Sequence, residues 1–277
     1  MNLETRDFRR LSTFIHDELG IKMPETKRTM LAGRLAKRLR ALGLASYREY
    51  CDYLFEGDGS NELIHLFDVV TTNKTDFFRE PSHFDYLTGT VLGELSRRTG
   101  AGKRRPLLLW SAGCATGEEP YTLTMVLREH CAAVGDDFSF AITATDISTR
   151  ALETARRAIY PHERVVPVPP RLRNKYLLRS RDRGSDLVRV VPENRQLVSF
   201  QRLNFMDEQF DLPKPFDVIF CRNVIIYFDK ETQERLVHKF CRHLQPGGYL
   251  FLGHSESLHG LNVPLTPVAP TVYRRAP

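Results

Sequence analysis

Two junctions between apolar runs and helical patterns carry residues that suit a nucleoside ligand. In the first, the run 107–110 leads through the small-residue loop 111–117 into a helix that starts with Glu118 and Glu119. Glycines in such a loop let a ligand approach the backbone closely, although a tight turn would also explain them. The loop has neither a dinucleotide nor a P-loop fingerprint, and acids at a helix start repel phosphate. The junction therefore favours a ligand with hydroxyls or positive charge.

Asp146 follows the next expected strand, 138–144. In Rossmann-like sheets, an acid at the end of the second strand hydrogen-bonds the ribose hydroxyls of an adenosine ligand. Capping of the helix that follows would be the better explanation of Asp146 if it stood alone. The two junctions taken together favour an adenosine site.

A third apolar strand, 216–221, delivers Arg222, Asn223 and, four residues later, Tyr227 to its carboxyl end. Ligands bind at the carboxyl ends of strands in open α/β sheets, and such polar groups are costly to bury without partners. We therefore expect them at the same site. The segment 71–80 (TTNKTDFFRE) is typical either of a ligand-facing turn or of a helix N-cap.

The amino-terminal part of the chain, residues 1–97, shows apolar residues at helical spacing only. This pattern predicts an all-helical domain with five helices. Gly20 and Gly43 are expected to end the first two helices, Ser46 to cap the third, and Pro81 to lie in the first turn of the fifth.

Residues 98–277 alternate short apolar runs with helical patterns. This alternation predicts a Rossmann-like α/β domain with a parallel sheet covered on both faces. The Pro-rich start and alternating pattern of 160–196 predict a small antiparallel β insertion. The other expected elements are strand 249–252 and helices 118–133, 149–158 and 230–244.

Charge is distributed unevenly along the 277 residues, which carry a net charge of +6. Segment 26–48 contains seven basic residues and no acid, and segment 149–203 contains thirteen basic and five acidic residues. Since these segments contribute +7 and +8, the rest of the chain carries −9. Two basic surfaces on an otherwise acidic protein indicate an anionic macromolecular partner.

Several classes of protein conflict with the composition. No run reaches the roughly 18–20 apolar residues of a membrane helix, and the first ten residues lack the apolar core of a signal peptide. The five cysteines are scattered without a C-x-x-C pair, which is typical of reduced thiols and offers no metal-ligand cluster. We therefore expect a cytoplasmic protein without a metal and without membrane insertion.

Several motifs of the chain occur in the order found in CheR-type chemotaxis receptor methyltransferases, which the sequence resembles over nearly its whole length. They are TTNKTDFFRE, WSAGCATGEEPY, ATDIS, LNF, FDVIFCRNVIIYFD and GGYLFLGHSESL. The resemblance implies transfer of a methyl group from S-adenosylmethionine to glutamates of chemoreceptor cytoplasmic helices. The products would be glutamyl methyl esters and S-adenosylhomocysteine. A glutamate carboxylate is already ionised at neutral pH, so this reaction needs no general base.

The resemblance also assigns roles to individual residues. Arg79 and Tyr227 would be catalytic, through positioning of the acceptor carboxylate. Asp146 would bind the ribose, and Asn204 and Phe205 would flank the adenine. The residues that would contact the cofactor are Asn73, Thr75, Arg79, Glu119, Asp146, Asn204, Phe205, Arg222 and Asn223. The strand-end triplet 254–256 (HSE) is given no catalytic role.

The basic helix 27–42 would dock on the acidic chemoreceptor helices, although a solvated charged face is the alternative. The residues expected to dock are Arg34, Lys37, Arg38 and Arg40. The insertion could also bind a carboxyl-terminal tether of the receptor. Its loop 179–185 has one glycine and three arginines, a departure from the glycine-rich loop of family members that bind a tether.

Two other functions remain open at this point: a nucleic-acid methyltransferase and a non-catalytic signalling adaptor of the same fold. Base-amino methyltransferases usually carry [DN]-P-P-[YF] at the strand end where this chain has NVII at 223–226. We therefore expect no nucleic-acid partner, and we expect a monomer.

Overall fold

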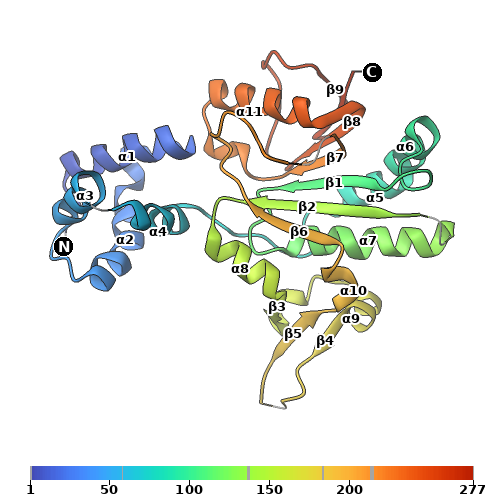
Figure 1. Cartoon of the computed structure of the whole chain (residues 1–277), viewed down its shortest axis with the longest axis horizontal. Helices are drawn as coiled ribbons and strands as arrows, with labels where there is room; N and C mark the ends of the chain where they lie inside the picture. Colours follow the sequence, from blue (N-terminus) through green and yellow to red (C-terminus); the bar gives the residue numbers. More distant parts are fainter. Residues whose placement is uncertain (1, 58, 136–137, 183, 213–214, 277) are drawn as a thin grey trace.

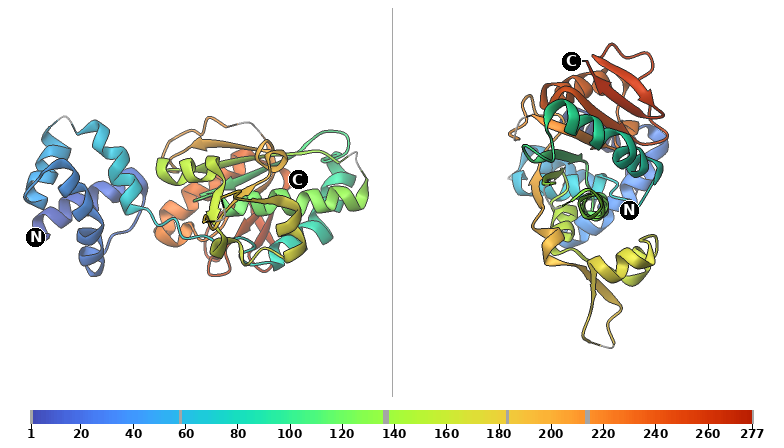
Figure 2. Two further views of the ribbon diagram at one scale, coloured as in Figure 1. Left: turned by 90° about the horizontal axis from the view of Figure 1, so that it is seen from below. Right: turned by 90° about the vertical axis from the view of Figure 1, so that its right-hand side faces the viewer.

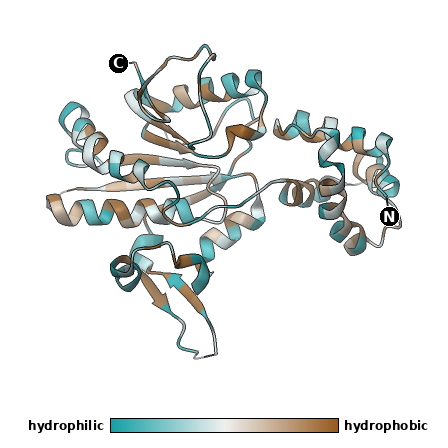
Figure 3. Cartoon of the chain, turned by 180° about the vertical axis from the view of Figure 1, so that it is seen from behind, coloured by the Kyte–Doolittle hydropathy of each residue, from teal (hydrophilic) through white to brown (hydrophobic). Residues whose placement is uncertain are grey.

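An all-helical region lies beside an α/β region from which a small second sheet projects (Figure 1). The computed structural model describes residues 2–57, 59–135, 138–182, 184–212 and 215–276. Hydrophilic and hydrophobic residues alternate along the helices of both regions, as amphipathic packing requires (Figure 3). Within these residues, none of the helices combines the length and hydropathy needed to cross a bilayer.

Four α-helices surround the core of the helical region. They are α1 (Thr5–Leu19), α2 (Arg28–Leu42), α3 (Tyr47–Glu56) and α4 (Ser60–Val70), with the 3-10 turn η1 (Glu25–Lys27) before α2. The expected helix ends are confirmed: Gly20 and Gly43 adopt left-handed φ angles of 68° and 69°, and Ser46 accepts a hydrogen bond from the Glu49 amide. The core consists of the residues at helical spacing, among them Leu11, Ile15, Leu31, Leu35 and Leu39.

The α/β region is built on a seven-stranded sheet with the order β6-β2-β1-β7-β8-β10-β9. Its strands are β1 (Leu107–Ala112), β2 (Phe140–Asp146), β6 (Val198–Arg202), β7 (Phe216–Cys221), β8 (Leu244–Leu252), β9 (Leu265–Ala269) and β10 (Val272–Arg275). The first five in this list pair in parallel, as expected, whereas β10 is antiparallel to both of its neighbours. The sheet is therefore mixed, with an antiparallel edge.

Helices cover both faces of this sheet. They are α5 (Ser82–Tyr86), the π-helical turn η2 (Leu87–Val91), α6 (Leu92–Thr99), α7 (Glu118–Val134), α8 (Thr149–Arg157) and α11 (Lys230–His243). The core of one face joins α5, α6 and α7 to residues such as Leu109 and Phe220, and the core of the other joins α11 to Trp110 and Ile219. Because α5 and α6 share the sheet's core rather than that of α1–α4, we propose a domain boundary near residues 71–72 in place of the one expected at 97–98.

The insertion forms a separate antiparallel sheet with the order β3-β5-β4 that projects from the α/β region, as the right-hand view of Figure 2 shows. Its elements are β3 (Ile159–Pro161), η3 (His162–Val165), α9 (Pro170–Tyr176), β4 (Leu177–Arg179), β5 (Leu187–Val190) and α10 (Pro192–Arg195). The antiparallel insertion expected over 160–196 is thus confirmed. One of its three loop arginines, Arg183, lies outside the described residues.

Candidate functional site

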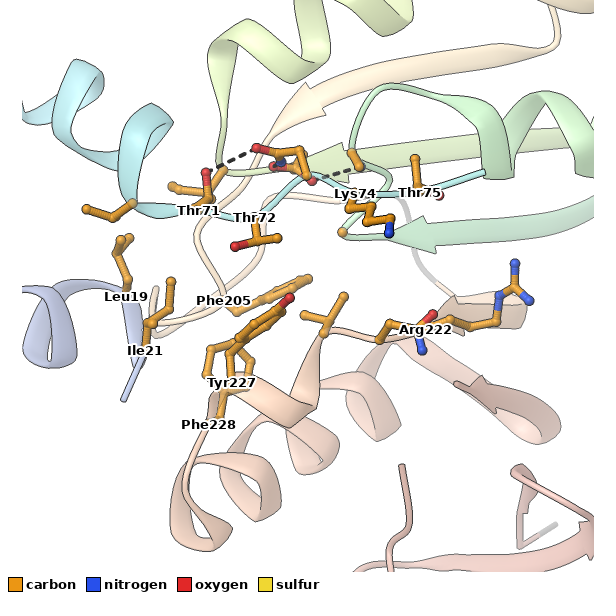
Figure 4. Close-up of a pocket in the computed structure, with 18 of the residues that line it drawn as sticks. Leu19, Ile21, Thr71, Thr72, Lys74, Thr75, Phe205, Arg222, Tyr227 and Phe228 are labelled. Carbon is orange, nitrogen blue, oxygen red and sulfur yellow. Dashed lines mark hydrogen bonds between the residues drawn. The ribbon is translucent and has the colours of Figure 1, made fainter. Parts of the chain in front are cut away.

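A cleft lies between the helical region and the carboxyl ends of β1, β2 and β7. All the residues predicted to be catalytic or to contact the cofactor line this cleft: Asn73, Thr75, Arg79, Glu119, Asp146, Asn204, Phe205, Arg222, Asn223 and Tyr227. Figure 4 shows Phe205, Tyr227 and Arg222 around it, together with Leu19 and Ile21 from the helical region. The fold therefore brings the predicted residues together, and their individual roles remain predictions.

The buried carboxylate of Asp146 binds the loop that follows β1. Its Oδ2 accepts a hydrogen bond from the Ala115 amide at 2.9 Å, and its Oδ1 accepts one from the Ser148 amide at 2.9 Å. The N-cap of α8 is Ser148, whose Oγ accepts from the Ala151 amide. Helix capping therefore does not explain Asp146. Burial raises the pKa of Asp146, while the two amide donors oppose that rise.

Backbone geometry explains the small residues of the loop 111–117. Gly113 and Gly117 have φ angles of 77° and 97°, a backbone conformation that residues with a side chain rarely adopt. A Cβ atom on Gly113 would lie 2.7 Å from Val224, and one on Gly117 would lie 2.8 Å from Ala155. The loop is therefore held tightly against α8 and the turn that follows β7, and Gly113 lines the cleft beside Asp146.

The two acids at the start of α7 have different surroundings. Glu119 accepts from Arg222 Nε at 2.7 Å and from Ser111 Oγ at 2.7 Å, and it lines the cleft. Glu118 instead forms an ion pair with Arg164 of the insertion. Each oxygen of Glu119 keeps one acceptor site, because an ionised carboxylate has about four. Of the two acids, Glu119 is therefore the one available to a ligand.

The guanidinium of Arg222 lies at the centre of a polar cluster. Its Nη1 donates to the Arg79 carbonyl at 2.7 Å and lies 3.4 Å from Glu80 Oε2 and 3.3 Å from His83 Nδ1. Burial, and the charge of Arg222, lower the pKa of His83 to about 4, so this histidine is neutral at pH 7. Glu80 and His83 were missed by the sequence analysis because their partner lies about 140 residues away.

Metal-ligand spacing occurs in one place among the residues that the structure describes. Glu80, His83 and His254 have potential ligand atoms within 4.8 Å of one another. Arg222 donates toward both Glu80 and His83. The guanidinium of Arg222 thus already supplies the positive charge that a metal ion would bring to this cluster.

The segment 71–80 connects the helical region to the α/β region. It is neither helical nor a β-strand, and no helix begins within it. Phe77 is buried against Tyr160, and the Phe78 amide donates to Thr122 Oγ1 at 3.1 Å. Helix α5 starts only after its N-cap, Pro81. The capping alternative is therefore wrong, and the two phenylalanines anchor a segment whose polar residues line the cleft.

The turn after β6 joins the α/β region to the end of α1. Asn204 Nδ2 donates to the Glu18 carbonyl at 2.7 Å, while its Oδ1 accepts from the Met206 amide at 3.0 Å. Phe205 contacts Phe240 edge to face, with ring centroids 5.7 Å apart. Asn204 therefore has a structural task in addition to its predicted place beside the adenine.

Tyr227 ends the 3-10 turn η4 (Ile225–Tyr227) that follows β7. Its carbonyl accepts a hydrogen bond from the Lys22 amide at 3.0 Å, and Lys27 Nζ lies 6.0 Å from its ring centroid. Asn223, at the start of this turn, has a φ of 60°. The linker between α1 and α2 thus forms part of the cleft wall opposite the sheet.

Two of the four residues expected to dock on a receptor are bound within the helical region. Arg34 Nη1 donates to the Val70 carbonyl at 2.6 Å, at the end of α4. Arg38 forms two hydrogen bonds, at 2.9 and 2.6 Å, with the buried carboxylate of Glu62. The exposed residues of the set are Lys37 and Arg40. Arg34 and Arg38 therefore stabilise the helical region. Docking on a receptor remains a prediction for Lys37 and Arg40.

Comparison with known proteins gives consistent matches over almost the whole chain. Residues 6–71 match the family model "CheR methyltransferase, all-alpha domain", and residues 73–273 match "CheR methyltransferase, SAM binding domain". The chemotaxis protein methyltransferase of Borreliella burgdorferi is 38% identical over 275 residues, which cover 99% of this chain and 96% of the relative.

Two further relatives have similar identities. Chemotaxis protein methyltransferase 2 of Pseudomonas aeruginosa is 39% identical over 271 residues, covering 98% of this chain and 93% of the relative. The chemotaxis protein methyltransferase of Escherichia coli is 38% identical over 271 residues, covering 98% and 91%.

Proposed function

Because the chain belongs to the CheR methyltransferase family, and is thus an S-adenosylmethionine-dependent methyltransferase of chemotaxis, we propose that its methyl acceptors are glutamate side chains of chemoreceptors. The nucleic-acid methyltransferase and the adaptor are not favoured. The carboxyl group as acceptor, the roles of single residues and the way in which the receptor docks belong to this proposal.

The observation that carries the proposal is the charge of the cleft. The basic residues that line it are Lys27, Arg34, Lys74, Arg79 and Arg222, and its acids are Asp146 and Glu119, of which Glu119 pairs with Arg222, so basic side chains outnumber acidic ones. Such a lining attracts an anionic acceptor. A glutamate carboxylate is anionic at neutral pH and needs no base to remove a proton before it attacks.

The residues at the strand ends fit the cofactor. Asp146 combines a carboxylate that faces the cleft with an adjoining loop where Gly113 leaves no room for a side chain. In our proposal, Asp146 accepts hydrogen bonds from the ribose hydroxyls, Asn204 and Phe205 lie beside the adenine, and Glu119 binds near the amino-acid portion. When bound, the cofactor supplies a methyl group activated by its sulfonium charge.

The reaction is an in-line displacement. The acceptor carboxylate attacks the methyl carbon, the carbon–sulfur bond breaks, and the electron pair of that bond stays on sulfur. Both charges disappear, which leaves a neutral ester and neutral S-adenosylhomocysteine. The enzyme's contribution is alignment and partial desolvation of the reactants. We assign Arg79 and Tyr227 to orienting the carboxylate, since a tight ion pair would weaken it as a nucleophile.

The decisive experiment incubates the chain with methyl-tritiated S-adenosylmethionine and a panel of chemoreceptor cytoplasmic domains. We expect label that mild base releases as methanol, and receptors with glutamine at the methylated glutamates should lose it. Base-stable label on nucleic acid, or no transfer to any receptor, would refute the proposal. The variant Arg79→Ala serves as the inactive control, with Lys103→Ala, an exposed residue away from the cleft, as the active one.

Receptor docking can be tested with the same panel. We propose that the exposed residues Lys37 and Arg40 contact the acidic receptor helices. The panel, with and without the receptors' terminal peptides, also tests whether the insertion binds a tether. Cytoplasmic location and a monomeric state stay predictions.

A further inference from the structure

Glu256, just after the end of β8, has a buried side chain whose carboxylate is surrounded by backbone amides. Its Oε2 accepts from the Gly253 amide at 2.6 Å and from the Asn223 amide at 2.8 Å. Its Oε1 accepts from the Val224 amide at 2.7 Å and from the Ile226 amide at 3.3 Å. Within the part of the chain that the structure describes, no basic side chain forms an ion pair with Glu256.

This set of donors requires an ionised carboxylate. An ionised carboxylate has about four acceptor sites, which equals the number of amides that point at Glu256, whereas a protonated one would place an O–H donor against an N–H donor. Hydrogen bonds to a charged acceptor are also shorter and stronger than neutral ones. The negative charge of Glu256 is therefore stabilised by backbone dipoles alone.

Three of the four amides belong to the turn that follows β7. Asn223 has a left-handed φ of 60°, and residues in such conformations persist only where their surroundings hold them in place. Gly253 packs directly against it, since a Cβ atom on Gly253 would lie 2.4 Å from Asn223 Nδ2. Glu256 thus fixes the irregular backbone between Arg222 and Tyr227.

The effect on Tyr227 follows from its backbone hydrogen bonds. The Tyr227 amide donates to the Val224 carbonyl at 3.2 Å, which closes the turn whose other amides bind Glu256. The Tyr227 carbonyl accepts from the Lys22 amide at 3.0 Å. The backbone of Tyr227 is therefore restrained from two sides, by the linker between α1 and α2 and by the turn that Glu256 holds.

We propose that Glu256 is a positioning residue for the methyl acceptor, because its ionised carboxylate holds the turn that presents Asn223 and Tyr227 to the cleft. The inference rests on the proposed function, in which Tyr227 orients the acceptor. Glu256 acts through the backbone of the turn and contacts neither reactant.

The main test compares Glu256→Gln with Glu234→Gln. The glutamine amide keeps one acceptor oxygen but turns an N–H₂ group toward backbone donors. Glu234 also accepts from a backbone amide, that of Asn262, on a surface away from the cleft. We expect Glu256→Gln to lower kcat for ester formation about 10- to 100-fold, as a misplaced acceptor site does, and to raise the Kd for S-adenosylmethionine by a smaller factor, since Asn223 lies on the same turn. Glu234→Gln should match the wild type.

Hydrogen exchange followed by mass spectrometry supplies a readout that is independent of activity. Peptides over 222–228 should lose protection in Glu256→Gln, while those over β7 keep it. Equal loss of cofactor binding, kcat and protection throughout the sheet would show a merely structural role and overturn the inference. So would a variant with wild-type kcat and protection.

The wild-type chain gives a second test in case Glu256→Gln fails to fold. At pH 7 the four amides that bind the Glu256 carboxylate should exchange about as slowly as the amides of β7, because their acceptor is buried and held in place. Exchange of these amides much faster than that of β7 would overturn the inference. A wild-type chain that forms no base-labile ester refutes the proposed function, whereas the exchange pattern separately decides whether Glu256 holds the turn.

Discussion

Arg222 Nε donates a hydrogen bond to Glu119 Oε2 at 2.7 Å, and this contact joins the end of β7 to the first turn of α7. Both side chains are buried, and Arg222 also binds the carbonyl of Arg79 in the segment that leads from the helical region. One guanidinium therefore links three parts of the cleft wall that are distant in sequence.

Removing one member of this pair should destabilise the protein. Glu119→Ala leaves the buried guanidinium without its main counter-charge, a change that lowers the free energy of unfolding by about 3–5 kcal/mol in comparable pairs. Urea unfolding measures this change. Glu153→Ala breaks an exposed ion pair with Arg157 and should cost less than about 1 kcal/mol. Equal effects of the two substitutions would show that the buried pair has no special importance.

Asp146→Asn should weaken binding of S-adenosylmethionine while the fold persists. The asparagine loses a charged acceptor for the ribose hydroxyls, worth about 1.5–3 kcal/mol, which corresponds to an affinity about 10- to 100-fold lower. Isothermal titration calorimetry gives the Kd, and far-UV circular dichroism checks the fold. Asp182→Asn, in the insertion, is the control. An unchanged Kd for Asp146→Asn would remove this residue from the ribose site.

The basic helix α2 should divide into stabilising and docking residues. Arg38→Ala leaves the buried carboxylate of Glu62 without its counter-charge, although the Tyr50 hydroxyl still donates to it, so we expect a loss of about 3–5 kcal/mol in unfolding free energy. Arg40→Ala should stay within about 0.5 kcal/mol of the wild type but raise the KM for the receptor. That increase should shrink as salt is added, because exposed charges are screened. A KM for Arg40→Ala equal to that of the wild type at low salt would argue against docking through this residue.

Contact between the two regions should depend on pH through His16 and Asp229, whose side chains lie 3.1 Å apart. This hydrogen bond raises the pKa of His16. The Thr232 amide and, secondly, His16 lower the pKa of Asp229 to about 2, so Asp229 stays ionised throughout the pH range in which His16 titrates. A histidine with a raised pKa stabilises the folded state below its unfolded pKa of about 6.5 and stops doing so as pH rises through the folded value.

His16→Gln should therefore lower the free energy of unfolding at pH 5.5, by less than about 1 kcal/mol because the pair is partly exposed. The difference from the wild type should be smaller at pH 9. Urea unfolding at both values measures it, with the exposed His259→Gln as the control. A difference that grows with pH would have the wrong sign for this ion pair.

The strand-end residues could be predicted from sequence because their signal is local. Asp146 and Arg222 each follow an apolar run of strand length, and parallel strands present their carboxyl ends at one edge of the sheet. The residues at the strand ends that border the cleft could thus be predicted from short local stretches of sequence.

Other features depend on partners far away in sequence. Glu256 binds amides up to 33 positions away, and Glu80 lies 142 positions from Arg222. The basic residues of α2 looked unpaired because Glu62 lies on another helix. Strand β6 was missed since it is only partly buried at the edge of the sheet, and β9 since its residues are exposed or half-buried.

The hydrogen bond from the Lys22 amide to the Tyr227 carbonyl offers a way for the linker between α1 and α2 to couple the binding of two ligands. The same stretch of chain borders the cleft and continues through η1 into α2. A cofactor bound in the cleft and a receptor bound to α2 would therefore both contact this one continuous segment. If the bound cofactor shifts this segment so that the receptor binds more tightly, the bound receptor must strengthen cofactor binding by the same factor.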